Sequence, residues 1–242
     1  MNLSISAKNR LIFALDVPNR KEAESYVRAL GDTVGCFKVG LELFIKEGPD
    51  VLKTVKQNSS ASIFLDLKLH DIPATVRSAL RSAATHGVQF ITVHGSDGSA
   101  ILQTANEVKD LGLEVLAVTV LTNVSESELG GLGYKENLSL RQLVLDRANI
   151  AKESGCAGVV CSGEEVALIK RACSNHFKVV VPGIRPLWAD VKKDDQSRIV
   201  TPKDAISNGA DLIVVGRPIR DAKDPNIAAL KIVEEIESAL SA

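Results

Sequence analysis

The segment DLKLHD, residues 66–71, is the part of the sequence best suited to chemistry, because it holds two carboxylates and an ammonium close together. It follows the apolar run 62–65 and precedes a helix-opening segment that begins at Pro73. In a strand, Asp66 and Lys68 would point to the same face, whereas Asp71 would lie beyond the strand end. Unpaired charges on the inner face of an apolar strand are strongly unfavourable, so these groups must compensate one another or serve a function. A buried salt bridge that only closes one end of a sheet is the alternative interpretation.

The composition indicates a single α/β domain, residues 1–242, that acts on a small molecule. A formal net charge of -1 and 4% aromatic residues argue against a nucleic-acid-binding protein. No apolar run reaches the roughly 20 residues of a membrane span, and the first residues lack the apolar core of a signal peptide. The cysteines show no C-x-x-C spacing, so we expect a cytoplasmic protein with free thiols at Cys36, Cys156, Cys161 and Cys173.

Short apolar runs rich in β-branched residues alternate with longer amphipathic segments, and this alternation predicts a (β/α)8 TIM barrel. The expected strands are 10–15, 36–39, 62–67, 89–93, 114–120, 157–160, 178–181 and 211–215. The expected helices are 21–30, 73–86, 100–111, 138–154 and 228–240. An open doubly wound sheet is the alternative, but it usually has a Gly-rich turn after its first strand, and Asp16-Val17-Pro18 is not one.

Polar residues follow the apolar runs, and in a barrel the carboxyl ends of all strands would converge on one pocket. These residues are Asp16, Lys38, Asp66, Lys68, His94, Thr122, Ser162, Arg185, Gly216 and Arg217. A lysine that faces the interior at position 38 would lose its charge unless carboxylates such as Asp66 keep it ionised. We therefore expect an alternating network of charges made up of Lys38, Asp66, Lys68 and Asp71.

Two further segments are suited to binding phosphate. Gly216 and Arg217 end the last expected strand and precede a short helix, a place where barrels commonly bind phosphate. Arg185 follows the preceding strand, and the polar loop after it could offer Gln196 or Arg198 to a ligand. Together these residues predict an anion site on the side of the pocket opposite the DLKLHD segment.

Several of these features also have simple structural explanations. We expect His94 to be a hydrogen-bonded barrel histidine and Ser162 to be the N-cap of a helix that starts near Glu164. The loop 192–198 is either a ligand-binding loop or a solvated charged excursion. The Gly-rich loop 122–135 is either a cover over the pocket or a flexible surface loop, and the sequence leaves both possibilities open.

A set of segments along nearly the whole chain gives a more specific indication. They are LD at 15–16, FKVG at 37–40, DLKLHDIP at 66–73 with Thr75, VTVLT at 118–122, PGIRP at 182–186, DQSR at 195–198 and VGRPI at 215–219. With this set the chain resembles the orotidine 5'-phosphate decarboxylase family. The D-x-K-x-x-D pattern is shared with the related 3-keto-gulonate 6-phosphate decarboxylases, whereas the other segments favour the pyrimidine branch.

The resemblance implies decarboxylation of orotidine 5'-phosphate to uridine 5'-phosphate in de novo pyrimidine biosynthesis, with no metal or organic cofactor. Lys68 would protonate C6 of the pyrimidine, and Asp66 would lie against the departing carboxylate. Lys38 and Asp71 would hold the ammonium of Lys68 in place. Loss of carbon dioxide from a ring without an electron sink leaves a localised carbanion, which a fixed ammonium can stabilise and then protonate.

The resemblance also implies how the substrate is bound. Asp16 and Lys38 would bind the ribose hydroxyls, and Thr122 would bind the pyrimidine. The phosphate would be bound by Arg185, Gln196, Gly216 and Arg217. Asp71 and Thr75 would reach in from the partner subunit, so the resemblance implies a homodimer with shared active sites.

Three other functions remain as alternatives. The first is a metal-dependent sugar-phosphate lyase of the 3-keto-gulonate 6-phosphate decarboxylase type. The second is a Schiff-base aldolase that uses Lys38 or Lys68, although flanking carboxylates favour the ammonium over the free amine. The third is a barrel that binds a phosphate ligand without turnover.

Overall fold

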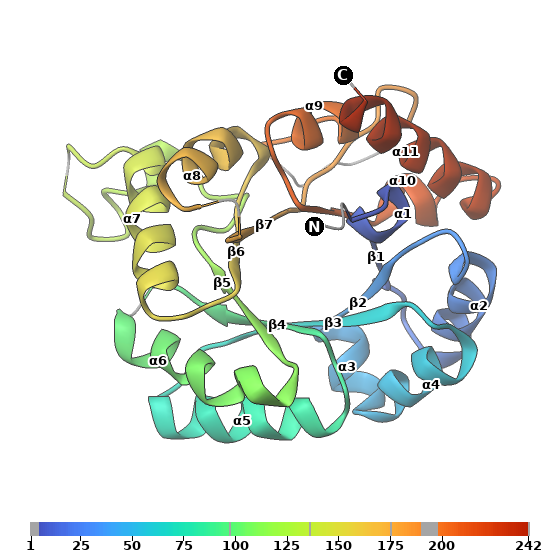
Figure 1. The fold of residues 1–242 in the computed structure, drawn as a ribbon, viewed down its shortest axis with the longest axis horizontal. Coiled ribbons are helices and arrows are strands. Elements are labelled where there is room, and N and C mark those ends of the chain that lie inside the picture. The colour runs from blue at the N-terminus through green and yellow to red at the C-terminus, as the bar shows by residue number, and fades with distance from the viewer. Residues whose placement is uncertain (1–4, 97, 136, 175, 190–197, 242) are drawn as a thin grey trace.

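A closed barrel of parallel strands occupies the centre of the molecule in the computed structural model (Figure 1). The structure describes residues 5–96, 98–135, 137–174, 176–189 and 198–241. The strands follow one another around the barrel in chain order, and the first pairs with the last. They are β1 (Leu11–Ala14), β2 (Cys36–Gly40), β3 (Ser62–Leu69), β4 (Phe90–His94), β5 (Glu114–Val118), β6 (Gly158–Val160), β7 (Lys178–Val181) and β8 (Leu212–Val215). This arrangement confirms the predicted (β/α)8 barrel.

Helices form a ring around the barrel (Figure 1). The α-helices are α1 (Ala7–Arg10), α2 (Arg20–Leu30), α3 (Leu41–Glu47), α4 (Asp50–Asn58), α5 (Pro73–Thr85), α6 (Ser99–Gln103), α7 (Leu140–Glu153), α8 (Val166–Ala172), α9 (Pro202–Ser207), α10 (Arg217–Arg220) and α11 (Pro225–Leu240). Within the part of the chain that the structure describes, 3₁₀ helices accompany them: η1 (Thr104–Leu111), η2 (Glu126–Glu128) and η3 (Gly163–Glu165). The first and last helices, α1 and α11, lie side by side.

The expected helix 100–111 was wrong in one respect, because the segment divides into the short helix α6 and the 3₁₀ helix η1. Thr104 lies where they meet, and its hydroxyl donates a hydrogen bond to the carbonyl of Ile101 at 2.5 Å. A threonine hydroxyl that bonds to a carbonyl of the preceding turn competes with regular helical hydrogen bonding. The change of helix type coincides with this hydrogen bond.

The barrel interior is filled by inward-facing side chains, including Ile12, Cys36, Phe64, Phe90, Leu116 and Leu212. Because strand side chains alternate between faces, the residues two positions further along point to the same side. On β2, β3 and β4 these residues are Lys38, Asp66 and Thr92. The apolar packing therefore gives way to polar side chains at the carboxyl ends of three neighbouring strands.

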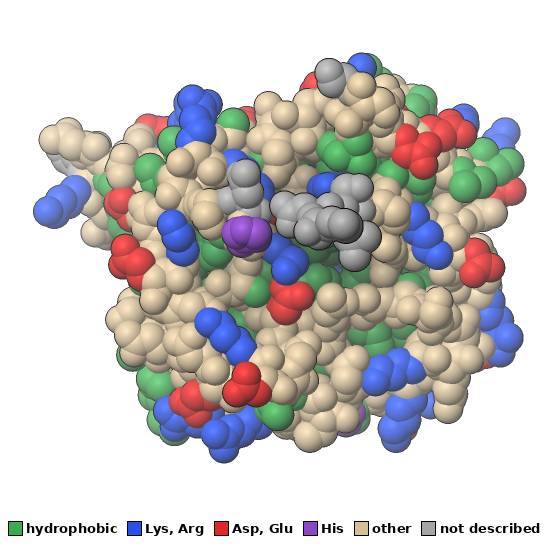
Figure 2. Space-filling view, in the orientation of Figure 1, with side chains coloured by type: hydrophobic (Ala, Val, Ile, Leu, Met, Phe, Trp, Pro, Cys, Tyr) green, Lys and Arg blue, Asp and Glu red, His purple; other side chains and the backbone are tan. Residues whose placement is uncertain are grey.

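The surface carries both signs of charge. On the face shown in Figure 2, basic and acidic side chains are interspersed around the rim. Within the described residues, none of the helices has the length and apolar character needed to cross a membrane.

Candidate active site

A cavity of about 540 Å³ lies at the carboxyl ends of the strands. Eight of the residues predicted for the site line it: Asp16, Lys38, Asp66, Lys68, Thr122, Arg185, Gly216 and Arg217. They come from β2 and β3 and from the segments that follow β1, β5, β7 and β8. The barrel thus brings together residues that are up to about 200 positions apart in the chain, as its topology requires.

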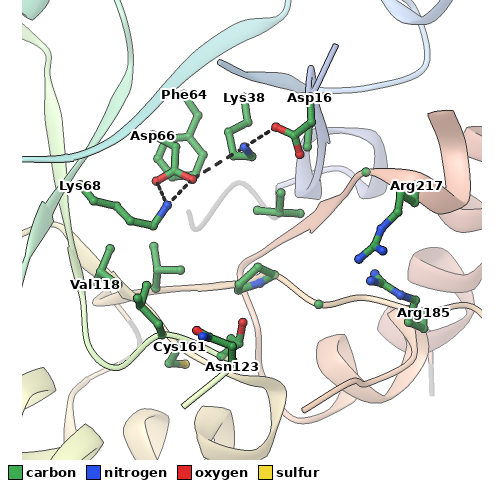
Figure 3. A pocket seen from close by; sticks show the side chains of 18 of the residues that line it. Asp16, Lys38, Phe64, Asp66, Lys68, Val118, Asn123, Cys161, Arg185 and Arg217 are labelled. Atoms are coloured by element: carbon green, nitrogen blue, oxygen red, sulfur yellow. Dashed lines mark hydrogen bonds and ion pairs between the residues drawn. The ribbon is translucent and has the colours of Figure 1, made fainter. Parts of the chain in front are cut away.

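An alternating chain of charges lines one side of the cavity (Figure 3). The Nζ of Lys68 lies 2.9 Å from each carboxylate oxygen of Asp66. The Nζ of Lys38 lies 3.7 Å from the Asp66 carboxylate and 3.1 Å from that of Asp16. Burial raises the pKa of Asp66, but Lys38, Lys68 and the hydrogen bonds from Lys68 and Thr92 outweigh this effect, so its pKa is lowered overall. Asp66 is therefore an ionised carboxylate, only 14% exposed, that is held between two ammonium groups.

The backbone near Lys68 is irregular, unlike the regular strand expected from the sequence. The pairing of β3 with β4 shifts register between Leu65 and Leu69, and Lys68 has a φ of 48°. Non-glycine residues rarely adopt this left-handed conformation. Lys68 and Asp66 nevertheless point into the same cavity, as the strand periodicity predicts (Figure 3).

Asp71 and Thr75 lie apart from this chain of charges. Both residues are exposed in the single chain, and neither lines the cavity. Asp71 accepts a hydrogen bond from the backbone N–H of Ile72 at 2.6 Å, just before α5 begins. Within one chain, the network of charges therefore contains Asp16, Lys38, Asp66 and Lys68, and Asp71 lies outside it.

Two arginines lie across the cavity from the charge chain. Arg185 follows β7, and Arg217 follows Gly216 at the start of α10. In Figure 3 their guanidinium groups point toward one another across this end of the cavity. The predicted anion site thus has two cationic side chains at the expected strand ends, whereas Gln196 lies outside the described residues.

Arg198 does not belong to the cavity lining, contrary to the suggestion that it could meet a ligand. Its Nη1 lies 2.5 Å from the Oε1 of Glu165, and its Nη2 lies 3.4 Å from the carbonyl oxygen of Leu121. Both charged side chains are buried, with 9% exposure for Arg198 and 1% for Glu165. Burial raises the pKa of Glu165, and the guanidinium of Arg198 opposes this effect. Arg198 therefore ties together the ends of two neighbouring strand segments behind the cavity wall.

The structural explanations for Ser162 and His94 fit the structure. The hydroxyl of Ser162 accepts a hydrogen bond from the N–H of Glu164 at 3.3 Å and caps η3, as predicted. His94 lies 2.8 Å from the hydroxyl of Ser96 and stacks on His70 with ring centroids 5.2 Å apart. Each of the two side chains is therefore hydrogen-bonded to a residue two positions further along the chain, just after its strand.

The loop after β5 is built around local hydrogen bonds. Ser125 and Glu128 form a capping box around η2. Further along, the hydroxyl of Tyr134 is hydrogen-bonded to Arg147 of α7, which also donates to the carbonyl of Thr119 at 2.5 Å. These contacts fix both ends of the segment that carries Thr122 and Asn123, so part of the loop forms a wall of the cavity.

Three residues of the site were missed by reasoning from sequence: Thr92, Asn123 and Arg220. Asn123 and Arg220 line the cavity. Arg220 donates to the backbone carbonyl of Asp16 at 2.9 Å, and Thr92 contacts the Asp66–Lys68 pair directly. Thr92 carries a usable signal, because it is the one hydroxyl within the apolar run 90–93 and lies two positions before His94.

Of the residues that the structure describes, the carboxylates that line the cavity are Asp16 and Asp66, and each is paired with an ammonium group. Among the described residues, no group of three or more His, Cys, Asp and Glu side chains is placed so that it could hold a metal ion.

Comparison with known proteins gives the family. The sequence profile described as "Orotidine 5'-phosphate decarboxylase / HUMPS family" matches residues 9–232. The chain belongs to this family. It is 48% identical over 242 residues to the orotidine 5'-phosphate decarboxylase of Desulfosudis oleivorans, a match that covers 98% of this chain and 96% of the relative. The corresponding enzyme of Methylococcus capsulatus is 44% identical over 241 residues, with 100% of this chain and 97% of the relative covered.

Solved structures agree with this assignment. The crystal structure of orotidine 5'-phosphate decarboxylase from Lactobacillus acidophilus superposes with a TM-score of 0.80 at 38% identity. The match covers 93% of this chain and 98% of that chain. Family membership, fold and cavity therefore point to the same kind of protein.

Proposed function

We propose that this protein decarboxylates orotidine 5'-phosphate to uridine 5'-phosphate in pyrimidine biosynthesis. The observation that carries the proposal is the Asp66–Lys68 ion pair, with 2.9 Å between ammonium and carboxylate, in a cavity that has Arg185 and Arg217 at its other end. Full-length relatives that are named for this activity support it.

The chemistry follows from the charges at the end of the cavity that holds Asp66 and Lys68. When the bond between C6 of the pyrimidine and its carboxylate carbon breaks, carbon dioxide leaves and the electron pair stays on C6. The ammonium of Lys68 stabilises that pair and then transfers a proton to C6, which forms the C6–H bond. Asp66 lies against the departing carboxylate, and Lys38 keeps Asp66 ionised and in place. Lys68 regains its proton from solvent after the product leaves.

The remaining cavity residues bind the nucleotide. Asp16 and Lys38 bind the ribose hydroxyls. This assignment is supported by their position between the Asp66–Lys68 pair and the arginine end of the cavity. Thr122 binds the pyrimidine from the wall after β5. Binding energy gained at the phosphate, remote from the bond that breaks, contributes to ordering the reacting groups.

The phosphate is bound by Arg185, Gln196, Arg217 and the amide of Gly216. The support for this part of the proposal is the placement of Arg185 and Arg217 opposite each other, because planar guanidinium groups match the oxygens of a phosphate. Gly216 lines the cavity beside Arg217.

The active site is completed by a second copy of this chain in a homodimer. Asp71 and Thr75 are exposed and lie outside the cavity of their own chain, so they are available to a neighbouring subunit. Large apolar side chains are also exposed after the neighbouring strands β2 and β3, with 49% exposure for Leu41, 78% for Ile45 and 65% for Ile72. Exposed apolar side chains of this size near a site are typical of an interface.

The test is the fall in absorbance of orotidine 5'-phosphate when purified protein is added in the presence of EDTA. We expect turnover that EDTA does not change. Absence of turnover would contradict the proposal. EDTA-sensitive turnover of a sugar phosphate would favour the metal-dependent lyase, and a stable adduct on Lys38 or Lys68 after borohydride reduction with a carbonyl substrate would favour the aldolase.

A further inference from the structure

Thr92 on β4 is a fully buried residue whose hydroxyl contacts both members of the Asp66–Lys68 pair. The hydroxyl accepts a hydrogen bond from the backbone N–H of Lys68 at 2.8 Å and donates one to the Oδ1 of Asp66 at 2.9 Å. The same Oδ1 lies 2.9 Å from the Nζ of Lys68. The three residues therefore form a closed ring of contacts that starts at the backbone of Lys68 and returns to its ammonium group.

The backbone geometry explains why a hydroxyl is needed at this position. Between Leu65 and Leu69 the register of β3 against β4 shifts, and Lys68 adopts a φ of 48°. A left-handed non-glycine residue costs on the order of 1–3 kcal/mol, and it persists where the surrounding structure determines it. The N–H of Lys68 finds its partner in the side chain of Thr92. Thr92 thus stabilises the strained conformation that directs Lys68 into the cavity.

A hydroxyl suits this position because it can accept and donate at the same time. Valine has nearly the same shape but can do neither, so it would leave the N–H of Lys68 and an oxygen of Asp66 without these partners. A polar group that loses its partner in a buried site carries the full penalty of its desolvation.

We propose that Thr92 is a positioning residue for the decarboxylation, which holds the backbone of Lys68 and orients the carboxylate of Asp66 so that the ammonium group points at the reacting carbon. This inference rests on the proposed function. Thr92 acts through Lys68 and Asp66 and takes no direct part in proton transfer. Its loss therefore affects the chemical step more than the binding of the nucleotide, because its hydroxyl contacts Lys68 and Asp66, whereas the residues assigned to the pyrimidine and the phosphate lie elsewhere in the cavity.

The experiment compares Thr92→Val, Thr92→Ser and Thr119→Val. Thr119 is the matched control, because it is fully buried near the carboxyl end of the next strand, β5, and its hydroxyl donates to the carbonyl of Val160 at 3.0 Å. We expect Thr92→Val to lower kcat by about ten- to hundredfold with the KM for orotidine 5'-phosphate within about twofold of wild type. Thr92→Ser keeps the hydroxyl and should restore most of kcat. Thr119→Val should lower the Tm by about as much as Thr92→Val does, but its kcat should stay within about threefold of wild type.

A wild-type kcat in Thr92→Val, with only a lower Tm, would overturn the proposal. Equal losses of kcat in Thr92→Val and Thr119→Val would also overturn it, because they would indicate a general loosening of the barrel.

A second measurement needs no substrate and separates this inference from the proposed function. Hydrogen exchange of the Lys68 backbone amide should be faster in Thr92→Val than in wild type or Thr119→Val, even if the wild-type protein does not turn over orotidine 5'-phosphate. Unchanged exchange would show that Thr92 does not hold this backbone.

Discussion

At the scale of single residues, the site depends on charges that stabilise one another. Asp66 lies between the ammonium groups of Lys38 and Lys68 with little of its side chain exposed, and it accepts a further hydrogen bond from Thr92. Breaking such a buried arrangement leaves an uncompensated charge, which is strongly destabilising. The same carboxylate is therefore important for both the chemistry and the folding of this end of the barrel.

The lowered pKa of Asp66 predicts a specific dependence of stability on pH. An unfolded aspartate has a pKa of about 3.9. Since the folded-state pKa is lower, ionised Asp66 contributes stability that is fully present above about pH 4 and is lost as the pH falls through the folded-state pKa. We expect Asp66→Asn to lower the free energy of unfolding most at pH 7, and the difference from wild type should narrow as the pH falls below about 4. Urea unfolding between pH 7 and pH 3.5 measures this.

Asp50→Asn is the control for this prediction. Asp50 also has a lowered pKa, because Lys53 donates a hydrogen bond to it at 2.7 Å, but its side chain is 54% exposed. Exposed pairs contribute little to stability, so the pH dependence of Asp50→Asn should stay close to that of wild type. If Asp66→Asn also followed the wild-type curve at a constant offset, the ionisation of Asp66 would not be coupled to folding.

At the scale of elements, the sequence predicted the barrel well because parallel strands are buried on both faces and leave continuous apolar runs. All eight expected strands are present with shifts of two residues or fewer at their ends. The left-handed backbone at Lys68 could not be predicted, because its N–H pairs with the hydroxyl of Thr92, which comes from the next strand. The role of Arg198 was equally hidden, since its partner Glu165 is 33 positions away in the chain.

The Glu165–Arg198 pair predicts an effect on substrate binding. Arg198 also contacts the carbonyl of Leu121, just before Thr122, and Val200 pairs with Ile184 beside Arg185. The pair therefore supports the cavity wall to which we assign the pyrimidine and the phosphate. Glu165→Gln should raise the KM for orotidine 5'-phosphate by about tenfold and change kcat less, because the Asp66–Lys68 pair lies on the opposite wall. Steady-state kinetics measure this directly.

Lys170→Met is the matched control for Glu165→Gln. It breaks another poorly exposed ion pair, in which Lys170 lies 2.6 Å from Asp211 at the amino end of β8. We expect a lower Tm with an unchanged KM. A similar rise in KM for both variants would mean that the effect of Glu165 on KM reflects general destabilisation.

At the scale of the whole molecule, barrel closure fixes the separation between the reacting end of the cavity and its arginine end. The charge chain lies at the ends of β1, β2 and β3, whereas Arg185 and Arg217 follow β7 and β8. Asp71 and Thr75 belong to neither group within one chain. The DLKLHD segment is thus divided, with Asp66 and Lys68 in the cavity of their own chain and Asp71 outside it on the surface.

This division predicts complementation between inactive subunits. Asp71→Ala and Lys68→Ala should each abolish most turnover as homodimers. In a mixed dimer, one site would combine Lys68 from the first variant with Asp71 from the second and would be intact, whereas the other site would lack both. With equal amounts and random exchange, half of the dimers are mixed and each has one intact site of two, so we expect recovery of about a quarter of wild-type activity.

The control for this prediction mixes Lys68→Ala with Asp66→Asn. Both residues belong to the cavity of their own chain, so no mixed site would be intact and activity should not recover. Differently tagged subunits, purified through both tags, confirm that exchange has occurred. Because Asp71 is exposed and removed from the cavity of its own chain, recovery with Asp71→Ala but not with Asp66→Asn requires that Asp71 acts across a subunit interface. Failure of both mixtures, with exchange demonstrated, would assign Asp71 a role confined to the surface of its own subunit.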